Sequence, residues 1–436
     1  MMLIASIFIL SSCSSKEKLL FLNWGEYIDE SLIEAFEDKY DCIVLMDLAE
    51  SNEIFYSKVR AGTTVYDIVC PSDYMVEKMY ENNMLMEIDF TKLESYDPNS
   101  EDIRYGVNHI TSIMQENTDD DIINYFVPYL WGTWGIMYNT ELEGLEEAVV
   151  NSSNEWSSLF DRDTLPKGTK VAMYDSHQHA YYAACRYLNL KNIYEEQSNS
   201  NLKKIEKAVK DMNYNAWGTD NIKKDIVAGN IDLGFMWTGD FLYYYCENVA
   251  NTVMDAYLND DVSYENFEEM INILTSDERV YEANGKVYTV GFDLFIPSDT
   301  VAFCDNLVIT KDSSNTDLAY KFIDFMCSNK VTINEDEVTP AFSNTYYVCY
   351  DTPFYSIYDE ILGLSDSDFT KEDIDLFKSE GGDPYDSSLY WKFYDFANSI
   401  AFDKYYPKDG AKGSILPNFD RSYVDIINTT FNNARI

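Results

Sequence analysis

Apolar runs of strand length alternate with amphipathic runs of helix length along the first part of the chain. The runs "LLFLNW" (19–24) and "CIVLMDLA" (42–49) are short and apolar, as buried strands are. Between them, residues 29–40 carry apolar side chains at helical spacing, and a helix-like segment at 51–62 precedes a strand at 66–70. This rhythm predicts an α/β fold with a mostly parallel sheet and helices on both of its faces.

The alternation of strands and helices returns in a second α/β region, from about residue 136 to 303, and again in residues 306–329. From about 351 to 390 the chain becomes irregular and acidic, and we expect a solvated surface insertion there. Asp and Ser in this insertion stand at positions like those of a calcium loop. The glycine and the terminal glutamate of an EF-hand loop are missing, so a calcium site is not expected.

Charge and cysteine content narrow the possible partners. The 436 residues include 76 acidic and 32 basic side chains, for a net charge of −44. Nucleic acid and anionic lipid headgroups are therefore poor partners, and cations are favoured ligands. Seven of the cysteines are widely spaced without a C-x-x-C pair, and the three histidines fit no zinc-protease or triad pattern. We expect buried free thiols and neither a metal nor a cofactor.

The first twelve residues, "MMLIASIFILSS", are apolar and too short to span a bilayer as a helix. They match the apolar core of a signal peptide (1–12), although no Lys or Arg precedes them. The stretch "LSSC" resembles the lipobox of bacterial lipoproteins, which implies lipid attachment at Cys13. The polar run that follows would serve as a tether.

Four motifs set an aromatic side chain beside a carboxylate or hydroxyl near a strand end. They are "NWGEY" (23–27), "PSDY" (71–74), "MWTGD" (236–240) and "FCDNLVIT" (303–310). Ligands of open α/β sheets bind at the carboxyl ends of strands. Aromatic faces hold methylenes and cationic nitrogens, and carboxylates accept charge-assisted hydrogen bonds from amines. The combination predicts a flexible polyammonium ligand.

In the order and spacing of these motifs, the chain from Leu19 to Pro340 resembles the spermidine/putrescine-binding component (PotD type) of polyamine ABC transporters. The resemblance implies the two-lobed periplasmic-binding-protein fold (type II), with mixed, mostly parallel sheets joined by crossover hinge segments that close on the ligand. Lobe I would comprise 13–134 and 304–340, and lobe II 135–303 and 341–436. We expect the crossings near 131–136, 303–305 and 339–340.

The resemblance also implies a set of ligand-binding residues. Trp24 and Tyr27 match an aromatic pair that would form one wall of the cleft, and Asp305 matches the carboxylate that anchors an amine. Ser72 and Tyr74 match a hydroxyl and an aromatic residue of the family's second loop. Trp237 matches a tryptophan that packs along the aliphatic chain of the ligand, and Phe303 stands where some members have tryptophan.

Two parts of the motif depart from the family. Where its members place two acids, this chain has Ser176 and His179, with Asp175 just before them, so either Asp175 takes the role or this end of the cleft accepts a different amine. The tyrosine usual shortly before the proline of "EVTPAF" is missing, and Glu337 stands near its place. Beyond Pro340 the resemblance returns only in "FDRSYVDIINTTF".

The resemblance implies an extracytoplasmic polyamine receptor that delivers its ligand to a membrane-embedded ABC permease. The protein would be monomeric, anchored to the membrane by its N-terminal lipid, and periplasmic if the organism has an outer membrane. One alternative is a receptor of the same fold for another solute, such as a sugar, thiamine or a metal. A glycosidase with paired carboxylates is disfavoured, because no acid and nucleophile stand out among 76 carboxylates.

Overall fold

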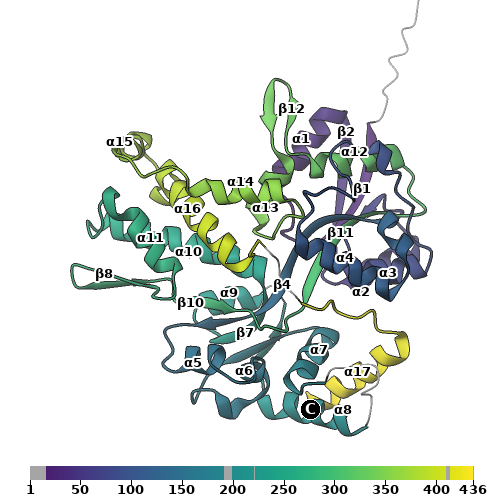
Figure 1. Ribbon diagram of the computed structural model, residues 1–436, viewed down its shortest axis with the longest axis horizontal. Coiled ribbons are helices and arrows are strands. Elements are labelled where there is room, and N and C mark those ends of the chain that lie inside the picture. Colours follow the sequence, from purple (N-terminus) through teal and green to yellow (C-terminus); the bar gives the residue numbers. More distant parts are fainter. Residues whose placement is uncertain (1–15, 191–198, 220, 409–412, 436) are drawn as a thin grey trace, which may run out of the picture.

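The computed structural model describes residues 16–190, 199–219, 221–408 and 413–435; the expected leader (1–12) and Cys13 lie outside them (Figure 1). Its strands form one nine-stranded sheet in the order β2 (Cys42–Leu48), β1 (Glu17–Asn23), β3 (Ile68–Val69), β11 (Ala302–Ile309), β4 (Val127–Asn139), β7 (Leu233–Trp237), β5 (Val171–Tyr174) and β6 (Ala216–Gly218), and β10 (Phe292–Phe295) pairs with β4. The α/β architecture predicted from the sequence is confirmed.

The pairing is parallel toward both ends of the sheet and antiparallel in its centre. β1 pairs in parallel with β2 and β3, and β5 pairs in parallel with β6 and β7. β11 and β4 run antiparallel to their neighbours. The sheet is thus two parallel halves joined by two antiparallel strands.

We call the half with β1, β2 and β3 lobe I. Its helices are α1 (Glu30–Tyr40), α2 (Asn52–Ala61), α3 (Asp73–Glu81), α4 (Tyr105–Asn117) and α12 (Thr316–Cys327), and it carries the hairpin β12 (Val331–Ile333) and β13 (Asp336–Val338). Two of these helices, α1 and α2, begin where the sequence predicts them. The side chain of Asp29 caps α1, that of Ser51 caps α2, and Gly62 ends α2 in a left-handed conformation with φ of 63°.

We call the half with β5, β6, β7 and β10 lobe II. Its helices are α5 (Leu145–Val150), α6 (Ser157–Phe160), α7 (His177–Tyr187), α8 (Asn199–Met212), α9 (Asn221–Val227), α10 (Thr238–Leu258), α11 (Phe267–Thr275), α14 (Tyr355–Leu362), α15 (Lys371–Glu380), α16 (Ser388–Tyr405) and α17 (Arg421–Ala434), with the hairpin β8 (Val280–Ala283) and β9 (Lys286–Thr289). A hydrophobic core of its own buries α10, α11 and α16.

β4 passes from one lobe to the other. Its first half pairs with β11 up to Thr133, and its second half pairs with β7 from Trp134 onward. Thr238, at the start of α10, fixes this change of partner, because its hydroxyl accepts from the backbone N–H of Thr133 at 3.0 Å and donates to the Thr133 carbonyl at 2.7 Å. The junction of the lobes therefore lies within continuous strand.

A third connection leaves lobe I through α13 (Pro340–Val348) and continues past β4. Asp351 and Trp131 exchange two backbone hydrogen bonds, of 2.9 and 3.1 Å. The Asp351 carboxylate forms a fully buried ion pair of 2.9 Å with Arg104, which precedes α4. Burial raises the pKa of Asp351 to about 8, while the guanidinium opposes that rise. These contacts make the junction a packed unit rather than a loose linker.

The segment expected to be an irregular insertion is instead mostly helical. Residues 351–390 contain α14, α15 and the start of α16, and Ile357, Tyr358 and Ile361 of α14 are fully buried. Its acidic side chains had obscured an apolar face at helical spacing.

Among the described helices, none is long and apolar enough to cross a membrane. The seven described cysteines are free and buried, as predicted.

Candidate functional site at the junction of the lobes

Asp305 lies on β11 at the junction of the lobes, with 5% of its surface exposed. The register of β11 against β4 shifts between Asp305 and Asn306, and such irregularities change the direction of a side chain. The Tyr27 phenol donates to Oδ2 of the carboxylate at 2.7 Å, and the Ser72 hydroxyl donates to Oδ1 at 2.5 Å. Three separate sequence motifs therefore meet at one carboxylate.

The electrostatics of Asp305 favour a positively charged partner. Burial raises the pKa of its carboxyl to about 6, and the hydrogen bonds from Ser72 and Tyr27 reduce that rise. Both donors are neutral hydroxyls, so they satisfy the oxygens without balancing the charge. A buried carboxylate held in this way gains most from an approaching cation.

Ser72 serves this carboxylate rather than its own helix. It occupies the N-cap position of α3, yet its side chain makes no capping hydrogen bond. Its hydroxyl accepts from the Asn52 amide at 2.9 Å and donates to Asp305, while its backbone N–H donates to Asn52 Oδ1 at 3.0 Å. Because an N-cap serine normally stabilises its helix, the unused cap marks Ser72 as a residue positioned for the site.

Tyr27, which donates to Asp305, belongs to a cluster of aromatic rings. The Tyr27 ring lies 5.0 Å from that of Tyr350 and 5.9 Å from that of Tyr129, and Tyr350 lies 6.1 Å from Phe303. Tyr350 was missed from the sequence. The expected tyrosine was sought before Pro340, whereas Tyr350 stands three residues before Pro353.

The Tyr350 ring also reaches lobe II through a glycine. A Cβ built on Gly239, in the first turn of α10, would lie only 2.3 to 2.5 Å from atoms of that ring. The ring and the helix backbone can be this close only because residue 239 has no side chain. Tyr350 therefore joins the first turn of α10 to Tyr27 of lobe I.

Trp24 and Tyr74 lie in lobe I but are not hydrogen-bonded to Asp305. Trp24 is partly buried, with its ring 4.6 Å from Phe55, and its buried indole N–H has no acceptor in the described part of the chain. The Tyr74 phenol donates to Glu53 at 3.3 Å. Glu53 also accepts from Gln178 of lobe II at 2.7 Å, so this contact crosses between the lobes.

An aromatic cluster on lobe II contains two predicted residues. Trp237 lies 4.3 Å from the Tyr174 ring and 5.8 Å from His179, and His179 packs 5.1 Å from Trp134. His179 Nδ1 shares a 2.7 Å hydrogen bond with the hydroxyl of Ser176. Burial lowers the pKa of His179 to about 3, so the imidazole is neutral at physiological pH.

Two predicted carboxylates have cationic partners within the chain. Asp175 pairs at 2.5 Å with Arg435, whose guanidinium lies 3.7 Å from the centre of the Trp217 ring. Glu337 pairs at 2.5 Å with Lys330 in the β12–β13 hairpin, which projects from lobe I at the top of Figure 1. The structure does not bring either carboxylate to Asp305.

A second cross-lobe contact was missed from the sequence. Lys223 of α9 is 6% exposed and pairs with Asp240 at 3.0 Å and with Glu26 of lobe I at 3.6 Å. Lys224 approaches the other oxygen of Glu26 at 3.7 Å. Glu26 lies between Trp24 and Tyr27 and has a φ of 52°, a left-handed conformation rare for glutamate. Its cationic partners lie some 200 positions away, beyond the reach of local motifs.

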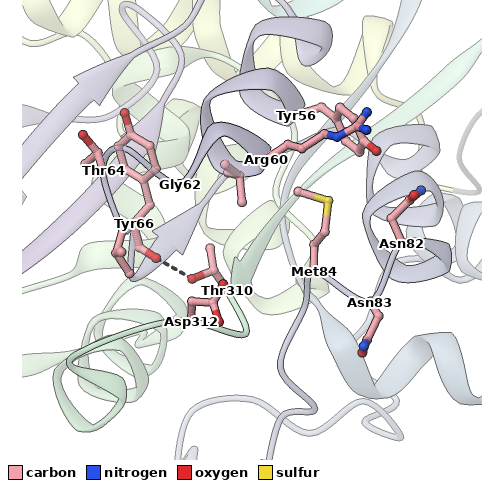
Figure 2. Close-up of a pocket in the computed structure, with 12 residues that line it drawn as sticks. Tyr56, Arg60, Gly62, Thr64, Tyr66, Asn82, Asn83, Met84, Thr310 and Asp312 are labelled. Carbon is pink, nitrogen blue, oxygen red and sulfur yellow. Dashed lines mark hydrogen bonds between the residues drawn. The ribbon is translucent and has the colours of Figure 1, made fainter.

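A cavity of about 250 Å³ opens elsewhere on lobe I (Figure 2). Arg60, Asn82, Asn83 and Asp312 are among its lining residues, and none of the predicted site residues is. Tyr66 lines it just before β3, whereas Ser72 follows β3, so the cavity lies at the other end of that strand. Across the described residues, no group of three His, Cys, Asp or Glu side chains could hold a metal ion.

The chain is similar in sequence to curated bacterial binding proteins. The chain is 27% identical over 334 residues to the putrescine/cadaverine-binding protein of Pseudomonas aeruginosa, covering 76% of this chain and 79% of that one. It is 28% identical over 227 residues to the spermidine/putrescine-binding periplasmic protein of Escherichia coli, covering 51% of this chain and 58% of that one.

Solved structures show the same fold. The spermidine/putrescine ABC transporter substrate-binding protein PotD of Streptococcus pneumoniae matches 96% of this chain and 99% of its own, with a TM-score of 0.56 and 21% identity. The TpPotD lipoprotein of Treponema pallidum matches the same shares with a TM-score of 0.57 and 18% identity. The type II periplasmic-binding-protein fold is thereby confirmed.

The bacterial extracellular solute-binding protein family matches residues 26–333, which include parts of both lobes and both of the strands, β4 and β11, that lie at their junction. This is a family of binding proteins rather than enzymes, in agreement with the expectation of a receptor. The chain belongs to the bacterial extracellular solute-binding protein family.

Proposed function

We propose that the protein is an extracytoplasmic receptor for a polyamine of the putrescine and spermidine class. The observation that carries the proposal is Asp305, a buried carboxylate whose two hydrogen-bond donors are the neutral hydroxyls of Tyr27 and Ser72. An ammonium group supplies the charge that these donors lack, and it can donate to lone pairs that they leave open.

The surrounding aromatic rings suit the remainder of such a ligand. Methylene chains gain by contact with aromatic faces, and a cationic nitrogen over a ring contributes about 0.5 to 2 kcal/mol. The proposed ligand-binding residues are Trp24, Tyr27, Ser72, Tyr74, Trp237, Phe303 and Asp305, with Tyr350 added from the structure. The relatives named for putrescine, cadaverine and spermidine support this ligand class.

The departures from the family motif alter one end of the proposed site. Asp175 and Glu337 are left out, because Arg435 and Lys330 already neutralise them. Ser176 and His179 are assigned a supporting role, in which they hold the aromatic cluster around Trp237. A neutral imidazole is consistent with a site that accepts a cation, since it adds no positive charge.

The receptor would deliver its ligand to a membrane-embedded ABC permease by bending at the junction of the lobes. We further propose that it acts as a monomer and that a lipid on Cys13 anchors it to the extracytoplasmic face of the membrane. Replacement of Cys13 by serine should then release the protein from the membrane fraction, and unchanged membrane association would contradict the anchor.

Isothermal titration calorimetry tests the proposed ligand class. Putrescine, cadaverine and spermidine are titrated into the purified protein, with maltose and thiamine as the alternative solutes. We expect saturable one-to-one binding of at least one amine and no heat of binding from maltose. Binding of maltose or thiamine without any amine would overturn the proposal and leave the family assignment intact.

A further inference from the structure

Lys223 places a protein ammonium group between carboxylates of the two lobes. The side chain is 8% exposed, and its Nζ donates to Asp240 of lobe II at 3.0 Å. A buried ammonium is costly unless a carboxylate pairs with it, and here Asp240 meets that need. If Lys223 only stabilised lobe II, its ammonium would need no carboxylate besides Asp240.

The same ammonium also faces lobe I. Glu26 lies 3.6 Å from Lys223 Nζ, in the loop that carries Trp24 and Tyr27. Asp240 follows Gly239, on which the Tyr350 ring lies, and that ring packs against Tyr27. Lys223 therefore joins carboxylates of both lobes beside the Asp305 site, as an ammonium group of a bound polyamine would.

We propose that Lys223 acts as a built-in ammonium that limits the number of charges on the ligand, and this inference rests on the proposed function. Near the junction, Lys223 and Lys224 face Glu26, and Lys223 also pairs with Asp240. Asp305 and Glu53 form no ion pair within the described residues, so each can take one ammonium group of a diamine. A third ammonium on a longer polyamine would meet a cation instead of an open carboxylate. Lys223 is thus a residue that determines specificity for a diamine over a triamine.

The test compares the affinities for putrescine and spermidine by calorimetry in three proteins. They are the wild type, Lys223→Met, which keeps the length and removes the charge, and Lys224→Met, the matched control. Lys224 has a side chain that is 56% exposed, and its one ion pair within the described residues is with Glu26, so its replacement changes net charge equally without opening the Asp240 position. Thermal melts of the ligand-free proteins show whether each variant is folded.

We expect the wild type to bind putrescine at least as tightly as spermidine, because the third ammonium finds no partner. Lys223→Met should raise the spermidine-to-putrescine affinity ratio by at least about tenfold, since it opens Asp240 and Glu26 to a ligand amine. In Lys224→Met the ratio should stay within about twofold of the wild type.

Three results would overturn the inference while leaving the proposed function in place. They are a wild type that binds spermidine more tightly than putrescine, an unchanged ratio in Lys223→Met, and an equal shift in Lys224→Met. The first needs no variant, so the proposal stays testable even if Lys223→Met does not fold. Failure of every protein to bind any amine would instead overturn the proposed function, and this inference with it.

Discussion

The phenol of Tyr27 and the carboxylate of Asp305, 278 positions apart in the chain, share a hydrogen bond of 2.7 Å. Tyr27 belongs to the loop after the first strand of lobe I, and Asp305 belongs to a strand that passes between the lobes. The bond therefore links the loop after β1 to a strand at the junction of the lobes. It leaves the Tyr27 hydroxyl beside the carboxylate that we propose to bind an amine.

The pKa of Asp305 predicts how amine binding depends on pH. Burial raises this pKa to about 6, so the carboxyl is ionised at pH 7 to 8 and becomes protonated below pH 6. Putrescine affinity should be flat from pH 8 to 7 and should fall roughly tenfold per unit below the pKa. Calorimetry at pH 5, 6, 7 and 8 measures this profile.

Glu77 provides the control for that profile. Burial raises its pKa to about 7, but its carboxylate accepts a hydrogen bond of 2.9 Å from the Asn117 amide of α4 and has no contact with Asp305. Glu77→Gln should leave the pH dependence of binding unchanged. A profile that lost its acidic limb in this variant would assign the titration to Glu77 and not to Asp305.

The raised pKa of Asp305 also predicts how the stability of the ligand-free protein depends on pH. Because the folded-state pKa of Asp305 is above the unfolded value of about 3.9, the folded protein binds the proton more readily. Its contribution to the free energy of unfolding is fully present below pH 4 and is lost as the pH rises through 6. Urea denaturation of ligand-free wild type and Asp305→Asn between pH 4 and 7 should show a stronger loss of stability with rising pH in the wild type, because Glu77 and Asp351 contribute equally to both proteins.

Trp24→Ala should weaken putrescine binding by roughly 1 to 3 kcal/mol, the range for losing an aromatic contact and its cation–π term. The ring also packs on Phe55, so a modest loss in melting temperature is expected as well. Trp24→Phe keeps an aromatic face and should retain most of the affinity. Intact binding in the alanine variant, after correction for unfolded protein, would make Trp24 a core residue only.

Gly239→Ala should disturb the site through Tyr350, because the added Cβ would lie 2.3 Å from its ring. Such overpacking costs about 1 to 3 kcal/mol of stability, and displacement of the ring should lower amine affinity as well. Gly363→Ala is the matched control, since its nearest neighbour would be an Asp366 oxygen at 3.7 Å. Equal melting temperatures for both variants would show that Tyr350 moves aside freely.

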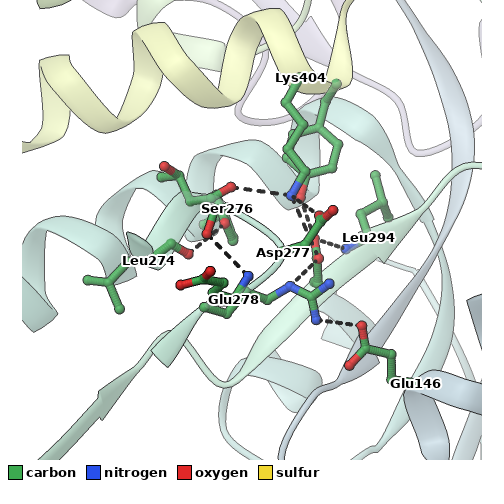
Figure 3. Close-up of polar contacts among 12 residues, drawn as sticks. Glu146, Leu274, Ser276, Asp277, Glu278, Leu294 and Lys404 are labelled. Carbon is green, nitrogen blue, oxygen red and sulfur yellow. Dashed lines mark hydrogen bonds and ion pairs between the residues drawn. The ribbon is translucent and has the colours of Figure 1, made fainter. Parts of the chain in front are cut away.

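Asp293→Asn should reduce stability without changing amine affinity. The buried carboxylate of Asp293 pairs with Arg279 at 2.9 Å and accepts from the Tyr405 phenol, which ties β10 to α16. Figure 3 shows Glu146 and Lys404 completing this network. Breaking a buried pair costs about 3 to 5 kcal/mol. Denaturation measures the stability of the variant, and calorimetry on the same sample measures its amine affinity. Reduced affinity in the folded variant would contradict the assignment of Asp293 to the fold rather than to the ligand site.

Features with a local cause could be predicted from the sequence. The caps at Asp29 and Ser51 and the strand–helix alternation depend on neighbouring residues, and the structure contains them. The convergence of Tyr27, Ser72 and Asp305 followed from the rule that ligands bind at strand ends, together with the family resemblance. The hydroxyl of Ser72 could be predicted for the site, although not its release from the helix cap.

Features with a distant partner could not be predicted in this way. Arg435 pairs with Asp175 across 260 positions, and nothing near Asp175 in the sequence indicates that its charge is already balanced. Lys223 looks like one of several helix lysines until the fold buries it between two carboxylates. The helices at 351–390 were obscured because their acidic exposed faces dominate the composition.

The central claim is that Asp305 binds an amine, and calorimetry of Asp305→Asn beside the wild type tests it most directly. The substitution keeps the shape of the side chain and removes its charge. We predict a loss of about 2 to 5 kcal/mol in putrescine affinity, the scale for breaking a buried charge pair. The melting temperature of the ligand-free protein at pH 7 should stay unchanged or rise, because an uncompensated buried charge is gone. Unchanged affinity together with a lower melting temperature would make Asp305 a structural residue and would contradict the claim.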